Sequence, residues 1–567
     1  MTSSRNKARH KAVMSGSGPG QGGFRQAQAW LHTWCGLWFS WLLFAVFLTG
    51  TLAVFQEPIS HWMTPEHRAE EAAAAAAPAD PGAGRAQRLA WAVAYMAEHH
   101  PAAAMWELWP SDAQGGGDLT VYWFDEKRQY VSAKLDPATG APVPAGAGGP
   151  ALRGTLAGQH FVDFHYELHA GSIGLWIVGI AALAMLVALV SGVITHKRIF
   201  KDFFTFRPGK GQRSWLDAHN AVAVLTLPFQ LMIAYTGIVI SGMSFMPAAK
   251  LAHYGAGAAA QQRFLDDLGG GQPARSGRAM PVPDLEAFAA RGQALMGQPV
   301  RAVVIDHPGD AAARIGVYGW NDDAAAQRHL SPTSGMASFS AATGAVLRVR
   351  LPGDADGGTA SLAQSAMGGL HMASFGGWAV KWLYFLCGLA GAAMMATGAI
   401  LFMVKRRSKH LGEFGGATAR VYRLIEALNV AAIAGLALAC VGYLWANRLV
   451  PLGIGQRAGW EQRVFFGLWL LALAHALWRP PAKAWREQLG LFAGLCLLLP
   501  VLDFLSTGDH LPAQWRRGDW ESVGVALVSL ALGVAAACAA RFLWRREKRA
   551  ALARRSPGAL AAAERSA

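Results

Sequence analysis

The chain has 567 residues, of which 53% are hydrophobic and only 15% are charged, and its formal net charge is +15. This balance is typical of an integral membrane protein and excludes an ordinary soluble domain. The positive charge is concentrated in short connections beside apolar stretches, which is the positive-inside distribution and does not indicate nucleic-acid binding.

Hydropathy divides the first two-thirds of the chain into four apolar spans around two outer segments. The first apolar run exceeds a signal-peptide core and is interpreted as a retained anchor. Each outer segment combines a helix with short strands and a turn, Asp136-Pro137-Ala138-Thr139-Gly140 in one and Ala341-Ala342-Thr343-Gly344 in the other. The predicted parts are a basic cytoplasmic tail (1–25), a first span (26–56), an outer α+β segment (57–168), a second span (171–196), a basic cytoplasmic link (197–214), a third span (215–246), a second outer α+β segment (247–370) and a fourth span (372–404).

The last third is predicted to be an appended membrane bundle, residues 420–545, followed by a cytoplasmic tail, 546–567. Its apolar spans lie near 424–446, 462–478, 487–505 and 520–543. About eight spans place every short basic connection, and both termini, on the cytoplasmic side. The expected fold class is therefore a mainly α membrane protein with two outer α+β domains.

Histidines recur at matched positions in the two halves. His32 precedes Thr49-Gly50 by 17 and 18 residues, and His219 precedes Thr236-Gly237 by the same 17 and 18 residues. The second match is His169, Gly174 and Trp176 with His371, Gly376 and Trp378, at offsets of 5 and 7. An internal duplication of a two-helix unit explains both matches and predicts a four-helix core.

The repeated histidines suggest two haem sites. Neutral imidazole is a good axial ligand for haem iron, and b-type haem needs no cysteine anchor. His169 and His371 are predicted to hold an outer haem, and His32 and His219 an inner one. His196, at the inner end of the second span, is an alternative inner ligand.

Two more histidines lie close to the outer site in sequence. His160 and His165 are predicted to contact the substrate or to support the ligands. A divalent-cation site formed by His160, His165, His169 and Glu167 is the competing interpretation. The five cysteines form no C-x-x-C or C-x-x-C-H pattern, which argues against disulfides, iron–sulfur clusters and c-type haem.

Three stretches resemble the PepSY-associated transmembrane family, in particular its branch of inner-membrane ferric-siderophore reductases. They are Leu31-His32-Thr33-Trp34-Cys35-Gly36-Leu37, the run from Ser191 to Phe204, and Trp215-Leu216-Asp217-Ala218-His219-Asn220. The two outer turns are similar to the strand–turn–strand of PepSY modules. The resemblance covers about residues 25–407, and residues 408–567 lie outside it.

The resemblance implies two b-type haems in the four-helix core and PepSY-like domains in the periplasm of a bacterial inner-membrane protein. It also implies reduction of ferric siderophores or other ferric chelates. The chain carries no Walker loop, and its G-x-G-x-x-G, Gly18 to Gly23, lies in the basic tail and follows no predicted strand, so the electron donor is expected to be quinol or a cytoplasmic reductase. Alternative functions are a non-catalytic PepSY-type regulator of peptidases and a siderophore or metal transporter.

Overall fold

The computed structural model describes most of the chain between residues 23 and 555. The described residues are 23–66, 83–111, 119–125, 130–143, 153–196, 207, 209, 211–242, 247–267, 274–320, 330, 334–353, 358–409 and 414–555. Most of the two predicted cytoplasmic tails and of the link 197–214 lies outside these residues.

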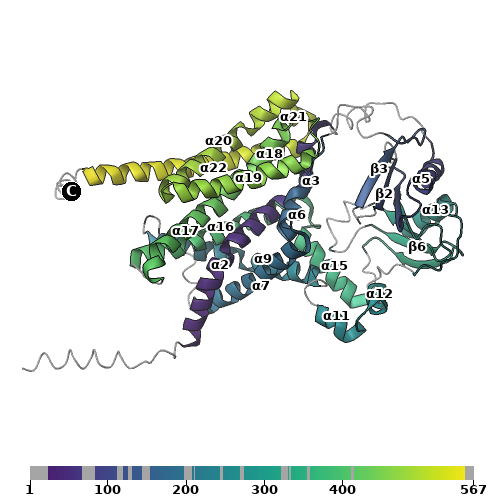
Figure 1. Ribbon diagram of the computed structural model, residues 1–567, viewed down its shortest axis with the longest axis horizontal. Coiled ribbons are helices and arrows are strands. Elements are labelled where there is room, and N and C mark those ends of the chain that lie inside the picture. The colour runs from purple at the N-terminus through teal and green to yellow at the C-terminus, as the bar shows by residue number, and fades with distance from the viewer. Residues whose placement is uncertain are drawn as a thin grey trace, which may run out of the picture.

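Four long apolar helices form the centre of the molecule (Figure 1). They are α2 (Phe24–Ala53), α7 (Gly171–Thr195), α9 (Gln212–Ile240) and α16 (Gly377–Lys409). α2 packs against α7 and α16, and α9 packs against the same two helices, so the four close into a ring. Two short helices, α6 (Gln159–Glu167) and α15 (Gly358–Met372), lead into α7 and α16. The four predicted spans of the core are confirmed.

The C-terminal extension is a second group of long helices. It contains α17 (Thr418–Val430), which continues through a π-helical turn, η2 (Ala431–Gly435), into α18 (Leu436–Leu449). α19 (Arg457–Trp478), α20 (Pro481–Thr507), the short α21 (Leu511–Arg517) and α22 (Trp520–Arg555) follow. Among the described residues, seven helices are long and apolar enough to cross a membrane, three of them in the extension. α19 is not one of them, because charged side chains occupy its first two turns, so an eighth span stays a prediction.

The two outer segments form one antiparallel sheet rather than two separate domains. Its strands run in the order β3-β2-β1-β4-β5-β6-β7. They are β1 (Met105–Trp109), β2 (Leu119–Phe124), β3 (Tyr130–Leu135), β4 (Val300–Asp306), β5 (Arg314–Gly319), β6 (Met336–Ser340) and β7 (Val346–Arg350). β1 pairs with β4 from Met105 opposite Asp306 to Leu108 opposite Val303. The expectation of two α+β domains is corrected here, because each half buries an otherwise exposed strand edge against the other.

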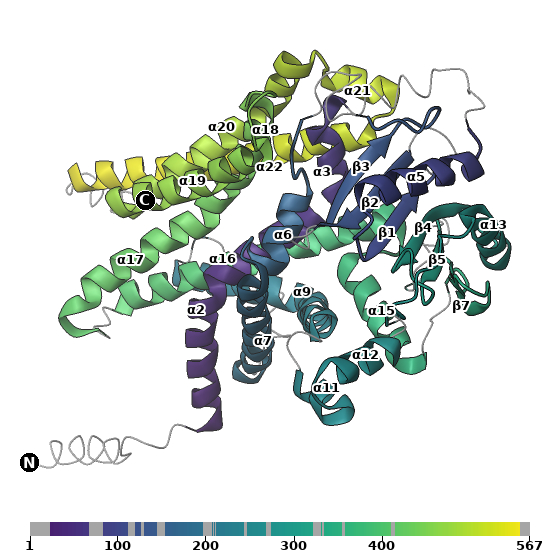
Figure 2. The same ribbon diagram turned by 45° about the vertical axis from the view of Figure 1, so that its right-hand side comes forward.

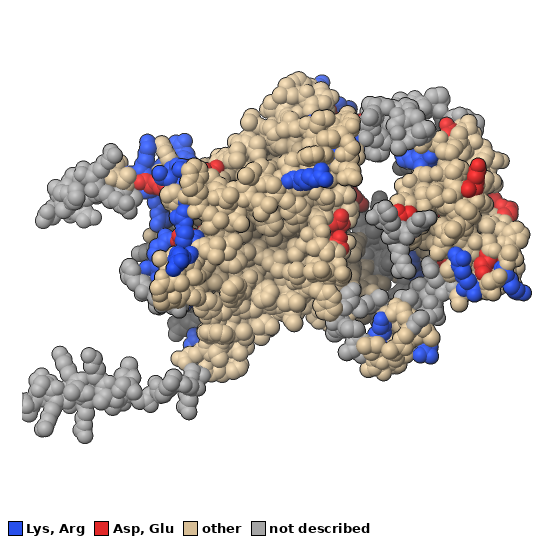
Figure 3. All heavy atoms as spheres, viewed as in Figure 1, with Lys and Arg blue, Asp and Glu red and all other residues tan. Residues whose placement is uncertain are grey.

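The sheet lies at one end of the helices and is packed by two helices of its own (Figure 2). α5 (Arg85–His99) and α13 (Leu285–Met296) share an apolar core with the sheet that includes Leu89, Met96, Leu108, Ile305 and Phe339. Three further short helices are α3 (Gln56–Met63), α11 (Pro247–Tyr254) and α12 (Ala258–Asp267). Figure 3 shows Lys and Arg gathered at the end of the helices farthest from the sheet, beyond a largely uncharged middle. This distribution agrees with the predicted positive-inside topology.

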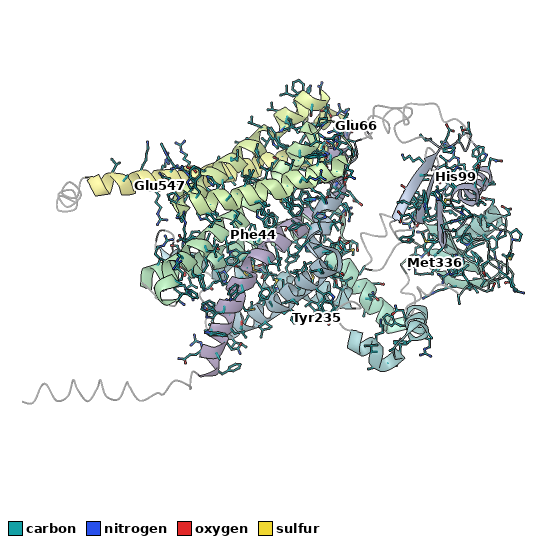
Figure 4. All side chains as sticks on the ribbon, in the orientation of Figure 1. Phe44, Glu66, His99, Tyr235, Met336 and Glu547 are labelled. Carbon is teal, nitrogen blue, oxygen red and sulfur yellow. The ribbon has the colours of Figure 1, made fainter. Side chains whose placement is uncertain are left out.

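A buried polar network fastens the extension to the core at the sheet end, near Glu66 in Figure 4. The Arg448 guanidinium on α18 lies 2.9 Å from the Asp503 carboxylate on α20 and donates to the Trp62 carbonyl of α3 at 2.5 Å. Arg153 pairs with Glu66 at 2.7 Å and donates to the Asn447 carbonyl at 2.6 Å. Because Trp62 and Arg153 precede α6, these bonds join the extension to the part of the chain that leads into the core.

Replacing Arg448 with leucine should destabilise the protein strongly. The side chains of Arg448 and Asp503 are 0% and 5% exposed, so the substitution leaves a buried carboxylate without its cation. Such a loss costs about 3–5 kcal/mol, and the thermal midpoint of the detergent-solubilised protein should fall. Arg517→Leu is the control, because Arg517 is 56% exposed in its pair with Asp509 and a surface pair contributes below about 1 kcal/mol. Equal midpoints for the two variants would contradict the role of the network.

Candidate functional site

Four histidines meet as two facing pairs inside the core. The rings of His32 on α2 and His219 on α9 have their centres 6.4 Å apart. The rings of His165 on α6 and His371 on α15 have their centres 6.0 Å apart. Each pair therefore takes one histidine from each half of the duplication.

All four rings are anchored in the same way on a neighbouring helix. The Nδ1 atom of His32 lies 2.8 Å from the Ala188 carbonyl, that of His219 lies 3.1 Å from the Met394 carbonyl, and that of His165 lies 2.8 Å from the Val46 carbonyl. The Nδ1 atom of His371 lies 3.0 Å from the Thr236 hydroxyl, which itself donates to the Met232 carbonyl and so accepts from the ring. Because a carbonyl only accepts, Nδ1 must carry the proton in each ring.

The anchored tautomer leaves Nε2 as the basic nitrogen of each ring. Among the described residues, no hydrogen bond is made by the Nε2 atoms of these four histidines. A hydrogen bond at one imidazole nitrogen that fixes the tautomer and orients the other is the usual support of a metal-ligating histidine. At the outer pair, burial and the neighbouring His165 lower the pKa of His371 to about 3, which keeps the imidazole neutral.

A glycine lies under each ring, because a side chain there would occupy the space of the imidazole. A Cβ would come within 2.6 Å of the His165 ring at Gly50 and within 2.9 Å of the His371 ring at Gly237. At the other pair it would come within 3.1 Å of the His32 ring at Gly192 and within 3.2 Å of the His219 ring at Gly398. Each glycine follows a serine or threonine: Thr49-Gly50, Ser191-Gly192, Thr236-Gly237 and Thr397-Gly398. The repeat seen in the sequence includes two of these four dipeptides, Thr49-Gly50 and Thr236-Gly237.

The two histidine pairs lie at opposite ends of the core. His32 and Gly50, where the two pairs meet α2, are 18 residues apart, which corresponds to about 27 Å of helix. This is close to the hydrocarbon thickness of a bilayer, about 30 Å. A redox group at each pair would thus stand near each face of the membrane.

The arrangement fits a metal held between two axial imidazoles. Two rings that share one metal, each with its nitrogen about 2 Å from the ion, have their centres about 6 Å apart, which matches both pairs. The surroundings are helices with apolar side chains, as a b-type haem requires. Among the described residues, no group of three or more His, Cys, Asp or Glu side chains could hold a metal ion, so the divalent-cation interpretation of His160, His165, His169 and Glu167 gains no support.

The predicted pairing of His32 with His219 agrees with the geometry, whereas His371 faces His165 instead of His169. His165 and His371 each lie six residues before the first residue of the next long helix, Gly171 or Gly377. The Gly and Trp used to align the halves occupy different turns: Trp176 is the sixth residue of α7, and Trp378 is the second of α16. An alignment of the two halves on Gly171 and Gly377 would have matched His165 with His371. His196 caps the C-terminus of α7, one turn beyond Gly192.

His169 belongs to a different cluster, at the boundary with the extension. Its Nε2 lies 2.9 Å from Nδ1 of His160, and the Gln462 amide of α19 lies 3.3 Å from its Nδ1. The His160 ring is 0% exposed and stacks on Tyr443 of α18 at 4.1 Å, and burial lowers the pKa of His160 to about 3. The cluster holds the corner between α6 and α7, where Leu168 and His169 have the positive φ angles 54° and 53°.

Comparison with known proteins places the four-helix core in a family. The model of the family described as PepSY-associated TM region matches residues 29–405, which include both histidine pairs and the sheet. The chain is also similar to an uncharacterized protein of Pseudomonas aeruginosa, with 27% identity over 404 residues that cover 69% of this chain and 95% of the relative. The extension from residue 408 onward lies outside the family match.

Gln462→Ala should loosen the α6–α7 corner. Non-glycine residues with positive φ cost about 1–2 kcal/mol each, so the corner depends on its neighbours, and the substitution leaves Nδ1 of His169 without its donor. We expect faster amide exchange at residues 165–171, measured by hydrogen–deuterium exchange. Gln488→Ala is the matched control, since it removes a similar bond from Gln488 to His475 within the extension. Equal exchange at the corner in both variants would show that Gln462 does not support it.

Proposed function

The chain belongs to the PepSY-associated TM region family, and for this member we propose the function of a haem-containing oxidoreductase of the bacterial inner membrane. It passes electrons outward and reduces ferric siderophores or other ferric chelates in the periplasm, so that iron leaves its carrier as Fe(II). One observation carries this proposal: four half-buried histidines form two facing pairs, each ring held at Nδ1 and presenting Nε2.

Each pair would hold one b-type haem, His32 with His219 and His165 with His371. When bound, the haem supplies one-electron chemistry at a membrane face. The protein would fix the histidine tautomers through three backbone carbonyls and the Thr236 hydroxyl, exclude water with apolar helices, and keep the two groups apart along α2. Axial ligands and their hydrogen bonds are the main means by which a protein sets a haem potential.

The direction of electron flow is inferred from the charge distribution. Lys and Arg gather at the end that carries His32 and His219 (Figure 3), and the positive-inside rule supports a cytoplasmic location for that end. The His165–His371 pair and the sheet then lie on the periplasmic side, where an imported ferric chelate arrives. Siderophores bind the hard Fe(III) ion far more tightly than Fe(II), so one electron weakens the complex without cleaving the ligand.

Alanine substitutions of the histidines test the assignment. Purified protein should contain two non-covalent haems per chain, and His165→Ala and His371→Ala should each lower the content to about half by removing one axial ligand. His169→Ala should keep both haems, because His169 faces His160. The measurements are haem content per chain and the electron paramagnetic resonance spectrum. A chain without a Soret band after haem reconstitution would refute the function, and loss of haem in His169→Ala alone would restore the pairing predicted from the repeat.

Gly50→Ala should disturb the outer pair specifically. The added methyl group would lie 2.6 Å from the His165 ring, so the ring must leave its place over the helix. We expect a changed spectrum and weaker retention of one haem during purification, with the other unaffected. Gly36→Ala is the matched control on α2, because a Cβ at Gly36 meets nothing within 4 Å. Identical spectra of the two variants would show that the glycine is not needed for ring placement.

A further inference from the structure

A large apolar groove lies between the core and the extension. Its volume is about 1360 Å³, and its walls come from α2 and α16 on one side and from α18, α20 and α22 on the other. Helices α2 and α22 each contribute one face to the groove: Leu48 and Leu52 of α2 lie four residues apart, as do Gly524, Val528 and Leu532 of α22. The groove exists only because the extension packs beside the core.

The groove is deep enough for a long hydrocarbon tail. Along α22 its wall runs from Glu521 to Leu532, a distance of 11 residues that corresponds to about 17 Å. This exceeds half of the hydrocarbon thickness of a bilayer, about 30 Å. The walls belong to helices that have the length and composition of membrane spans, so the occupant enters from the lipid phase.

One end of the groove is polar and carries side chains that can form hydrogen bonds with a ligand. His61 of α3 has Nε2 at 3.2 Å from the Asp519 carboxylate and Nδ1 at 3.6 Å from the Glu521 carboxylate. Arg517 lies in the same lining and is paired with Asp509 at 2.6 Å. This end lies on the sheet side of the helices, where α3 and α21 are found in Figure 1.

We propose that this groove binds a prenylated quinol, with the isoprenoid tail along α22 and the ring at His61, Asp519 and Glu521. The hydroxyl groups of the ring donate to the two carboxylates, and His61 can either accept or donate. The carboxylates Asp509, Asp519 and Glu521 outnumber the guanidinium of Arg517 there, so the phosphate of a phospholipid would meet an excess of negative charge. A neutral head that donates hydrogen bonds fits this end, and the aromatic side chains of Trp382 and Trp520 flank it.

The groove is adjacent to the outer histidine pair. Leu48 and Leu52 of the groove wall flank Gly50, over which the His165 ring lies. The groove and the pair thus lie on opposite sides of α2, a separation of about one helix diameter, about 10 Å. A quinol bound here would reach the outer pair directly, as a second point of electron entry beside the inner pair. This role rests on the proposed function, whereas binding of the quinol depends only on the groove.

The test uses purified full-length protein and, as the probe, decylubiquinol that is kept reduced under anaerobic conditions. Trp378, Trp382 and Trp520 line the groove, so binding should quench tryptophan fluorescence in a saturable way. Gly524→Leu places a side chain in the groove at a position where a Cβ meets nothing within 4 Å, so the helix accepts it. Gly490→Leu on α20 is the matched control, with equally open surroundings and no place in the lining. We expect Gly524→Leu to weaken binding at least about tenfold and the control to bind as the native chain does.

A second pair of variants tests the polar end. Glu521→Gln keeps the shape but turns an acceptor into a partial donor, and it should weaken binding, as should His61→Ala. Absence of saturable quenching, or equal affinity in Gly524→Leu and Gly490→Leu, overturns the proposal. So does a phospholipid that co-purifies with the native chain, is lost in Gly524→Leu and is not displaced by decylubiquinol. Haem content is measured on the same samples: quinol binding without haem refutes the oxidoreductase alone, and haem without quinol binding refutes the groove assignment alone.

Discussion

The hydrogen bond from a histidine Nδ1 to an oxygen of a neighbouring helix is the interaction on which the core depends. The acceptor is a backbone carbonyl for three of the rings and the Thr236 hydroxyl for His371. The bond joins two helices in a region without water, where an unpaired polar group is costly. It also fixes the direction in which the second ring nitrogen points. The glycine beneath each ring is part of the same constraint, because the imidazole lies against the helix backbone. Helix packing and ligand orientation are thus set by one contact.

The same contact is repeated with the symmetry of the duplication. In the first half, His32 of α2 docks on α7 and His165 of α6 docks on α2. In the second half, His219 of α9 docks on α16 and His371 of α15 docks on α9. Each facing pair crosses between the halves, so neither half can complete a site alone. Outside the helices, the pairing of β1 with β4 joins the halves a second time.

The extension is an integral part of this structure rather than an appended bundle. Its helices share one apolar core with α2, α6 and α7, and Arg448 and Asp503 link it to α3 through buried polar bonds. Gln462 reaches the corner that follows His165, and α18, α20 and α22 complete the groove beside α2. A family match that ends at residue 405 therefore omits side chains that contact His160 and His169.

The sequence by itself determined the membrane class, the spans of the core and the duplication, and it favoured the facing of His32 with His219 while His196 stayed an alternative. These follow from hydropathy and from spacing within a single helix, which the regular rise of the backbone preserves. Only the tertiary structure decided that His165 faces His371, because Gly174-x-Trp176 and Gly376-x-Trp378 occupy different turns of their helices. It also decided that the outer segments share one sheet, since the pairing of strand edges depends on where two distant segments meet, and no local pattern encodes that meeting.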